Sequence, residues 1–267
     1  MFPKLITFPV PEFLQGFLPA HISLHSYGLM IALGVIAAYY IMLRKSVKFG
    51  IDADKLSSLF IWVIVAAFVG GKLFFFFEDI GKYIDDPSRI KGAMGGGFVF
   101  YGSLIFAIPT IVWWLKKEKI AVRPFLDNLA FAGPVVHSLG RVGCFLAGCC
   151  HGKVCDTWMG VTFSHPDTLA AIKDAPLYPT QLFDIVVNLI ILLTVFLLDK
   201  KKKFEGQLFL VYLVMYAIGR SIVEIYRGDE ARGFLFGGAL SHSQFIALFI
   251  LIVSPIVWRR WSKQKGL

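Results

Sequence analysis

The sequence has few charged residues and lacks the glycine-rich fingerprints that bind nucleotides. Asp, Glu, Lys and Arg make up 17% of its 267 residues, whereas hydrophobic residues make up 57%. A water-soluble domain of this length needs more polar surface, so the composition favours a polytopic membrane protein. Neither G-x-x-x-x-G-K-S/T nor G-x-G-x-x-G occurs, and nucleotide binding therefore has no support.

The start of the chain also lacks the pattern of a secretory signal. Its first twenty residues hold four prolines and show no basic stretch followed by an unbroken apolar core, so we expect no cleaved signal peptide. No internal repeat is present either. The simplest organisation is one membrane domain over residues 1–267.

Long apolar runs dominate what is present. A bilayer crossing needs about 20 apolar residues, and these runs predict an all-α polytopic membrane protein with about seven transmembrane helices. The segments cover roughly 22–43, 58–77, 97–115, 125–147, 180–198, 207–226 and 242–258.

Lysine and arginine are unevenly divided between the two ends of these segments. Sixteen lie in the connections after the first, third and fifth segments and in the tail, against eight on the opposite side. Because cytoplasmic loops are the basic ones, the N-terminus is expected outside and the C-terminus in the cytoplasm. Residues 78–96 and 148–179 are then outer, periplasmic arms. The net charge of +9 reports this topology and contact with anionic lipid, and no nucleic acid partner is expected.

Three basic residues, Lys72, Arg141 and Arg220, fall inside the predicted helices. Ionisable groups at such positions are costly and usually face a cavity or a partner, and the topology places all three in the outer half of the membrane. The run YAIGRSIVEIYR puts four polar residues on one helix face, at i, i+4, i+8 and i+11. They are Tyr216, Arg220, Glu224 and Arg227.

Two interpretations of these arginines stay open. Guanidinium suits bidentate contact with phosphate, so Arg141 and Arg220 could together hold an anionic lipid headgroup. Alternatively, Arg220 and Glu224 form a buried ion pair that fixes helix packing. Tyr27 and Tyr101 lie at about the same predicted depth, as site residues or as interfacial anchors.

All four cysteines fall in one short stretch with the pattern C-x4-C-C-H-x3-C. It contains no C-x2-C pair, which argues against a zinc ribbon. Three thiols with an imidazole could bind a soft metal, an outer loop could form a disulfide, and a thiolate beside Arg141 could act as a nucleophile. The stretch comprises Cys144, Cys149, Cys150, His151 and Cys155.

Taken together, these motifs resemble the prolipoprotein diacylglyceryl transferases of bacterial inner membranes. The matches run in that family's order: HSYGLM at 25–30, GGFVFYGSLI at 96–105, GRVGCFLAGCCHG at 140–152, YPTQLFD at 178–184 and YAIGRSIVEIYRGDE at 216–230. The resemblance implies a seven-helix body with a lipid site open to the bilayer. It also implies transfer of a diacylglyceryl group from phosphatidylglycerol to a protein or peptide cysteine, with no cofactor or metal.

Some of the expected site residues match family positions, namely Tyr27, Arg141, Gly143, Gly152, Arg220 and Glu224, and the others follow from the residue patterns described above. The resemblance implies that the two arginines hold the lipid phosphate, and the substrate-binding set is Tyr27, Lys72, Gly143, Cys144, Gly152, Tyr216, Glu224 and Arg227. The catalytic set is Arg141, Arg220, Tyr101, Cys149, Cys150 and His151. His137, one turn before Arg141, is a further candidate base or a structural histidine.

This chain departs from the family's pattern around the reaction centre. Tyr101 stands where the family has histidine, Cys144 and Ala147 replace asparagines, and Cys149 replaces glutamate. Two alternatives to the transferase therefore stay open. One is a thiol redox or covalent-transfer enzyme on the same fold that uses Cys149 and Cys150. The other is a non-catalytic membrane protein that binds lipid or metal.

Overall fold

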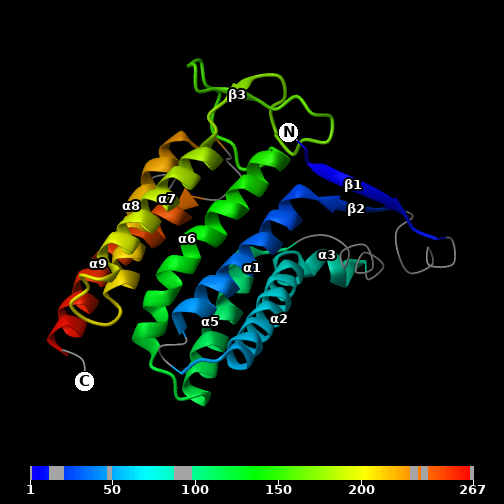
Figure 1. Ribbon diagram of the computed structural model, residues 1–267. Helices are drawn as coiled ribbons and strands as arrows, with labels where there is room; N and C mark the ends of the chain where they lie inside the picture. Colours follow the sequence, from blue (N-terminus) through cyan, green and yellow to red (C-terminus); the bar gives the residue numbers. More distant parts are fainter. Residues whose placement is uncertain are drawn as a thin grey trace. The chain divides into compact units, whose positions relative to one another are not determined.

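The computed structural model describes residues 2–11, 21–46, 50–86, 98–228, 234–235 and 240–264 (Figure 1). They belong to two compact units. The first comprises Met1–Ile41 and Leu126–Leu267, and the second comprises Met42–Phe125. Residues 87–97 of the expected outer arm lie outside the described residues.

Long helices make up most of the first unit, and short antiparallel strand pairs lie before α1, between α6 and α7, and between α8 and α9. The helices are α1 (Ser26–Ser46), α6 (Val122–Ala147), α7 (Thr180–Asp199), α8 (Gln207–Tyr226) and α9 (His242–Lys263), with the first residues of α6 and the last of α1 belonging to the second unit. The strand pairs are β1 (Lys4–Pro9) with β2 (His21–His25), β3 (Val161–Thr162) with β4 (Pro176–Leu177), and β5 (Phe234–Leu235) with β6 (Leu240–Ser241).

The second unit is built from α2 (Ala53–Glu78), α3 (Ile80–Asp85) and α5 (Phe100–Lys117). α2 begins where the side chain of Asp52 accepts the backbone N–H of Lys55, an N-cap that satisfies one of the free N–H groups of the first turn. It packs on α5 through glycines. A Cβ on Gly70 would lie 2.8 Å from the Cβ of Phe106, so only glycine permits this approach.

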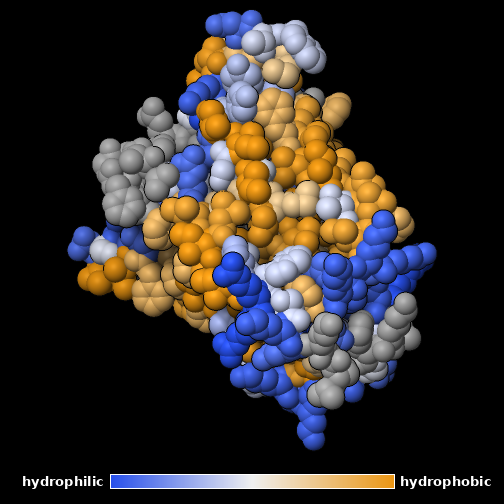
Figure 2. All heavy atoms as spheres, turned by 90° about the vertical axis from the view of Figure 1, so that its left-hand side faces the viewer, coloured by the Kyte–Doolittle hydropathy of each residue, from blue (hydrophilic) through white to orange (hydrophobic). Residues whose placement is uncertain are grey.

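The apolar surface of these helices confirms an all-α polytopic membrane protein. Six of them, α1, α2, α6, α7, α8 and α9, are long and apolar enough to cross a bilayer. Their large hydrophobic side chains point outward, such as Phe196 at 69% exposed and Ile256 at 63%. Figure 2 shows apolar residues over the middle of one face and hydrophilic residues toward its two ends. α5 covers the third expected segment, and the count of seven spans stays a prediction.

Inside the first unit, polar side chains are buried alongside the apolar core. A core of Ala130, Phe131, Ile191, Val195 and Leu208 joins α6, α7 and α8. Nearer the first residue of α7, the buried residues are Gln181, Asp184 and Asn188, each at most 2% exposed. Polar groups inside a membrane helix bundle usually mark function, and these lie on the helix that follows the expected outer arm.

Asp127 fixes the start of α8 from a neighbouring helix. Its Oδ1 accepts the backbone N–H groups of Leu208 and Phe209 at 2.9 and 3.2 Å, and its Oδ2 accepts that of Gly206 at 2.9 Å. Lys202 adds an ion pair at 3.0 Å. This carboxylate satisfies N–H groups that have no partner within their own helix and favours the positive end of its dipole.

The expected start of the first segment is revised. The first span was expected from residue 22, but residues 21–25 form strand β2, and α1 begins at Ser26. The pairing of β2 with β1, which lie eleven residues apart in the sequence, was not predicted. Residues 148–179 contain the short strand pair of β3 and β4.

Candidate active site

Arg141 lies near the end of α6 and joins two helices. Its Nε donates a hydrogen bond to Nε2 of His137 at 3.2 Å, one turn earlier on the same helix. The same Nε lies 2.9 Å from Oδ2 of Asp184 on α7, at ion-pair distance though outside hydrogen-bond geometry. Both side chains are largely buried, at 15% and 3% exposed. These two contacts hold the Arg141 guanidinium at its Nε atom.

Arg220 on α8 is held by a carboxylate of its own helix. Its Nη2 lies 2.8 Å from Oε2 of Glu224, four residues later, and their side chains are 11% and 5% exposed. This confirms the ion pair that the spacing predicts. The other terminal nitrogen of Arg220, Nη1, is buried and has no hydrogen-bond partner among the described residues. A buried donor without a partner is costly, so Nη1 of Arg220 is a candidate position for binding a ligand.

Tyr216 lies in the neighbourhood of both ion pairs. Its hydroxyl interacts electrostatically with Arg220, Asp184 and Arg141, which come from α8, α7 and α6. Its ring centroid lies 5.3 Å from that of His137. The structure thus brings together, within the first unit, the two arginines that the sequence singled out.

After α6 the chain turns sharply into the cysteine loop. Gly148 has a φ of +80°, a left-handed conformation that favours glycine, and a Cβ there would collide with the hydroxyl of Thr168. Cys150 also has a positive φ, +62°. The first turn of α7 holds this strained segment: Thr180 Oγ1 and Gln181 Nε2 each donate a 2.7 Å hydrogen bond to the carbonyls of Cys150 and Cys149.

Gly152 lies where the loop passes between two other segments. Its N–H donates to the carbonyl of Tyr178 at 2.8 Å, and it pairs with Arg227 in an antiparallel bridge. A Cβ on Gly152 would lie 2.5 Å from the carbonyl oxygen of Tyr226 and 2.6 Å from the Cβ of Tyr178, so no larger residue fits. Gly152 and the buried Arg227 thereby tie the loop to the end of α8.

His151 is occupied by the loop itself. Its Nε2 accepts the backbone N–H of Ala171 at 3.2 Å, so Nδ1 carries the ring proton and donates to the carbonyl of Gly152 at 2.9 Å. Both ring nitrogens are therefore engaged with backbone groups. The geometry supports a role for His151 in holding the loop rather than in proton transfer.

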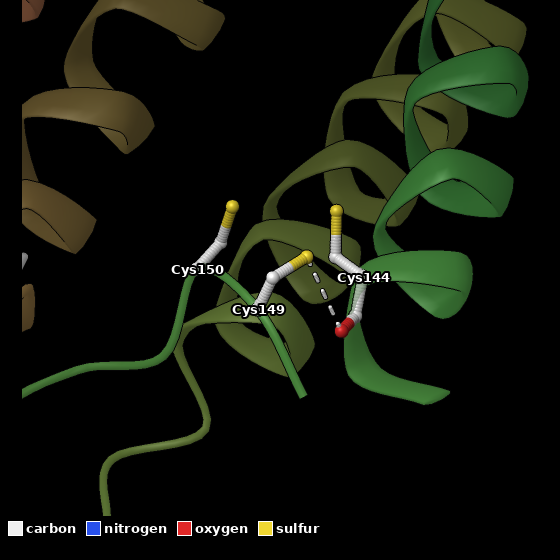
Figure 3. Close-up of side chains that lie close together, drawn as sticks. All are labelled: Cys144, Cys149 and Cys150. Carbon is white, nitrogen blue, oxygen red and sulfur yellow. Dashed lines mark hydrogen bonds between the residues drawn. The ribbon is translucent and has the colours of Figure 1, made fainter. Parts of the chain in front are cut away.

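Three of the four cysteines form a cluster. The sulfur atoms of Cys144, Cys149 and Cys150 all lie within 4.8 Å of one another (Figure 3). All four cysteines are free thiols. Cys155 is bound elsewhere, because its sulfur lies 2.9 Å from Oγ1 of Thr157.

The cluster favours one thiolate over several. Hydrogen bonds from Cys144 and Cys149 lower the pKa of Cys150, and the charges of Arg141 and Arg227 lower it further. Hydrogen bonding to Cys144 and Cys150, together with burial, raises the pKa of Cys149. A first negative charge on Cys150 is thus stabilised, while a second one beside it is opposed.

A cavity opens beside the cluster. It has a volume of about 440 Å³ and is lined by Cys149, Tyr27, His25 and Ala147 together with Pro3, Lys4, Asp167 and Leu169. Tyr27, at the start of α1, interacts electrostatically with all three clustered cysteines and with Arg141. Gly143 makes this possible, since a Cβ there would lie 3.1 Å from the Cα of Tyr27.

Lys72 and Tyr101 belong to the second unit. Tyr101 is 50% exposed on α5, and Lys72 lies on α2 with its Nζ 5.7 Å from the centroid of the Phe75 ring. Their membership of the site stays a prediction.

Sequence reasoning did not single out the polar residues of α7. Asp184 holds Arg141, and Thr180 with Gln181 holds the loop, yet none was named as a site residue. A signal was available for Asp184. It is an acid within a long apolar run, TQLFDIVVNLIILL, where an ionisable group is rarely neutral to function.

Comparison with known proteins identifies the family of this chain. The family model described as prolipoprotein diacylglyceryl transferase matches residues 16–260. The phosphatidylglycerol–prolipoprotein diacylglyceryl transferase of Clostridium tetani is 35% identical over 245 residues, 91% of this chain and 96% of that protein. The transferase numbered 2 of Clostridium perfringens is also 35% identical, over 92% of this chain and 93% of its own. That of Geobacter sulfurreducens is 28% identical over 248 residues. The chain belongs to the prolipoprotein diacylglyceryl transferase family.

Proposed function

We propose that this protein transfers the diacylglyceryl group of phosphatidylglycerol to the thiol of a prolipoprotein cysteine. Relatives that cover most of the chain carry this activity in their names. The apolar helices and the bacterial family make it a multi-pass protein of the bacterial inner membrane. Both substrates fit that location, since one is a membrane lipid and the other a membrane-bound precursor.

One observation carries the assignment of the lipid site. Nη1 of Arg220 is buried without a hydrogen-bond partner among the described residues, close to Tyr216 and within a site that also holds Arg141. A phosphate oxygen would satisfy this donor, and charge-assisted hydrogen bonds from guanidinium to phosphate are strong. We assign the headgroup phosphate to Arg220 and Arg141, with Asp184 and Glu224 as the residues that orient them.

The reaction is a displacement at carbon. The acceptor sulfur attacks the glyceryl carbon that carries the phosphate ester, a C–S bond forms, and the C–O bond breaks with its electron pair on the departing glycerol phosphate. Negative charge therefore develops on a phosphate oxygen, where preorganised guanidinium donors stabilise it most. The thiol proton has to leave before or during attack. Tyr101 is the candidate base that is left, because both nitrogens of His151 are engaged and Nε2 of His137 accepts the hydrogen bond of Arg141.

We further propose that the chain acts as one membrane domain with its N-terminus outside. The excess of lysine and arginine in the connections after α1, α5 and α7 supports this orientation. It places the 148–179 segment and the cavity beside Cys149 at the outer face, where a translocated prolipoprotein would present its cysteine.

A transfer assay tests the function. Membranes containing the protein receive phosphatidylglycerol labelled in its diacylglyceryl group and a lipobox peptide, and mass spectrometry examines both the peptide and the protein. We expect a lipidated peptide, lost in Arg141→Ala and kept in Arg259→Ala, an exposed arginine at the other end of the bundle. Label on Cys149 or Cys150 instead would replace this proposal with covalent transfer through a protein thiol, which the thiol cluster favours as second candidate.

A further inference from the structure

Three thiols converge on one point beside the lipid site. Cys144 comes from the last turn of α6, while Cys149 and Cys150 come from the loop that follows it. Figure 3 shows the sulfur of Cys149 lying between those of the other two residues. With all three sulfurs within 4.8 Å of one another, only a small contraction is needed for a common metal ion at the usual Zn–S distance of about 2.3 Å.

The scaffold holds these thiols in place before any ion arrives. Thr180 and Gln181 fix the carbonyls of Cys150 and Cys149, and Cys149 itself contacts the carbonyl of Cys144 through its sulfur at 3.7 Å. The left-handed turn at Gly148 and Cys150 is thereby enforced from α7. A ligand set whose backbone is already fixed binds metal with little ordering cost.

Among the residues that the structure describes, the ligands number three. The imidazole of His151 uses both nitrogens on backbone groups, and the sulfur of Cys155 lies against Thr157. A structural zinc site is closed by four protein ligands, whereas a catalytic one has three and keeps a position for substrate. The donor chemistry selects a thiophilic ion, because hard cations such as Mg²⁺ prefer oxygen.

The fourth position has a route from outside. Cys149 lines the cavity of about 440 Å³, whose far rim includes Lys4 of the first hairpin and Asp167 of the outer arm, joined by an ion pair of 3.1 Å. This volume is typical of small-ligand pockets and accommodates the side chain and neighbours of a peptide cysteine. Tyr27 lies on the same wall.

Charge also favours the ion. Three thiolates with one Zn²⁺ carry a net charge of −1, which is expensive to bury unless a cation lies close. Arg141 interacts electrostatically with Cys144 and Cys150, and Arg227 with Cys150. These guanidiniums supply the compensation.

We propose that Cys144, Cys149 and Cys150 bind one zinc ion whose open position takes the acceptor cysteine of the prolipoprotein as a thiolate. The acceptor role rests on the proposed function. Coordination releases the thiol proton to solvent, the metal-bound sulfur attacks the glyceryl carbon, and the C–O electron pair leaves with glycerol phosphate. The thioether product is a weaker zinc ligand than a thiolate and dissociates. The ion would thus activate the nucleophile in a chain where Cys149 and Tyr101 replace the family's glutamate and histidine.

Metal content is measured first, on the full-length protein purified in detergent under reducing conditions, stripped with a chelator and reloaded with Zn²⁺. We expect about one zinc per chain. Cys144→Ser, Cys149→Ser and Cys150→Ser should each lower retention at least about tenfold, because each removes a ligand. Cys155→Ser is the matched control, since a hydroxyl keeps the contact with Thr157. Zinc bound equally by the triple variant, or no zinc bound, overturns the site.

Cobalt replaces zinc to test the open position without any turnover. The stripped protein with Co²⁺ should show thiolate charge-transfer absorption, and a lipobox peptide with cysteine should shift the visible bands, while the same peptide with serine should not. An unshifted spectrum overturns the acceptor role.

Transfer by stripped and reloaded protein separates this inference from the proposed function. Transfer restored by Zn²⁺ supports both. Equal transfer without metal overturns the zinc inference and leaves the function standing. If neither the stripped nor the reloaded protein transfers lipid while the cobalt spectrum is as expected, the proposed function is overturned and the metal site is kept.

Discussion

Oγ1 of Thr180 donates a 2.7 Å hydrogen bond to the carbonyl of Cys150, across thirty residues of sequence. Together with the bond from Gln181 to Cys149, it makes the first turn of α7 the support of the cysteine loop. The outer arm lies between these partners in the sequence, and the two hydrogen bonds hold its two ends together. Loop position is therefore set by a buried helix end.

Removing that hydroxyl should loosen the loop. Thr180→Val keeps the side-chain shape but leaves a buried carbonyl without its donor, which costs about 1–3 kcal/mol. We expect a lower midpoint of thermal unfolding in detergent and faster alkylation of Cys150. Thr194→Val is the control, because its hydroxyl bonds only to the i−4 carbonyl of Ile190 on an exposed helix face. Equal effects of the two changes would contradict the assignment.

Arg220 should not tolerate lysine. Glu224 occupies Nη2, and the lipid phosphate is assigned to Nη1. A lysine ammonium cannot serve both partners with the same fork, so Arg220→Lys should slow transfer roughly a hundredfold, as loss of one transition-state donor does. The rate at saturating lipid should fall more than the apparent affinity. Arg259→Lys, at an exposed position, should leave both unchanged.

Asp184 is expected to act by positioning. Asp184→Asn keeps the size of the side chain but removes the charge that faces Arg141 at 2.9 Å. The unpaired guanidinium then turns toward other partners, and we expect about a tenfold loss of transfer or more, since small misplacement of a catalytic group is costly. Asp184→Glu should recover part of the rate. Recovery by glutamate distinguishes positioning of Arg141 from simple loss of packing.

Asp127 should matter for stability alone. Its carboxylate serves three backbone N–H groups and Lys202, so Asp127→Ala should lower the free energy of unfolding by about 3 kcal/mol or more. Asp52→Ala removes one exposed cap bond and should cost about 1 kcal/mol. Thermal unfolding in detergent measures both. Transfer per folded molecule should be unchanged in each variant.

Much of this architecture follows from sequence pattern. Apolar length predicts the helices, because each must span hydrocarbon, and the i, i+4 spacing predicts the pair of Arg220 and Glu224. The partner of Arg141 is harder to predict, since Asp184 lies more than forty residues away and only the packing of α6 on α7 brings the two together. The pairing of β1 with β2 was also missed, although the strands lie only eleven residues apart, because neither strand shows its partner in its own sequence.

The cysteine loop marks the limit of sequence reasoning. Its composition indicates thiol chemistry but leaves a disulfide, a metal ligand set and a nucleophile open. Backbone geometry reduces these alternatives. The positive φ at Gly148 and the hydrogen bonds of His151 to the backbone determine which sulfur atoms lie close together. Cys155 belongs to the same sequence pattern but lies outside the cluster, because its sulfur contacts Thr157.

The two ion pairs of the site differ in when they can form during biogenesis. Arg220 and Glu224 are one turn apart on α8, so their pair forms as soon as that helix does. Arg141 and Asp184 lie on different helices, and α6 is synthesised first. If α6 entered the bilayer before α7 was made, the guanidinium of Arg141 would lack Asp184, at considerable cost. Retention of α6 at the translocon until α7 has been made would remove that cost, and the loop between them would then close around a charge that is already neutralised.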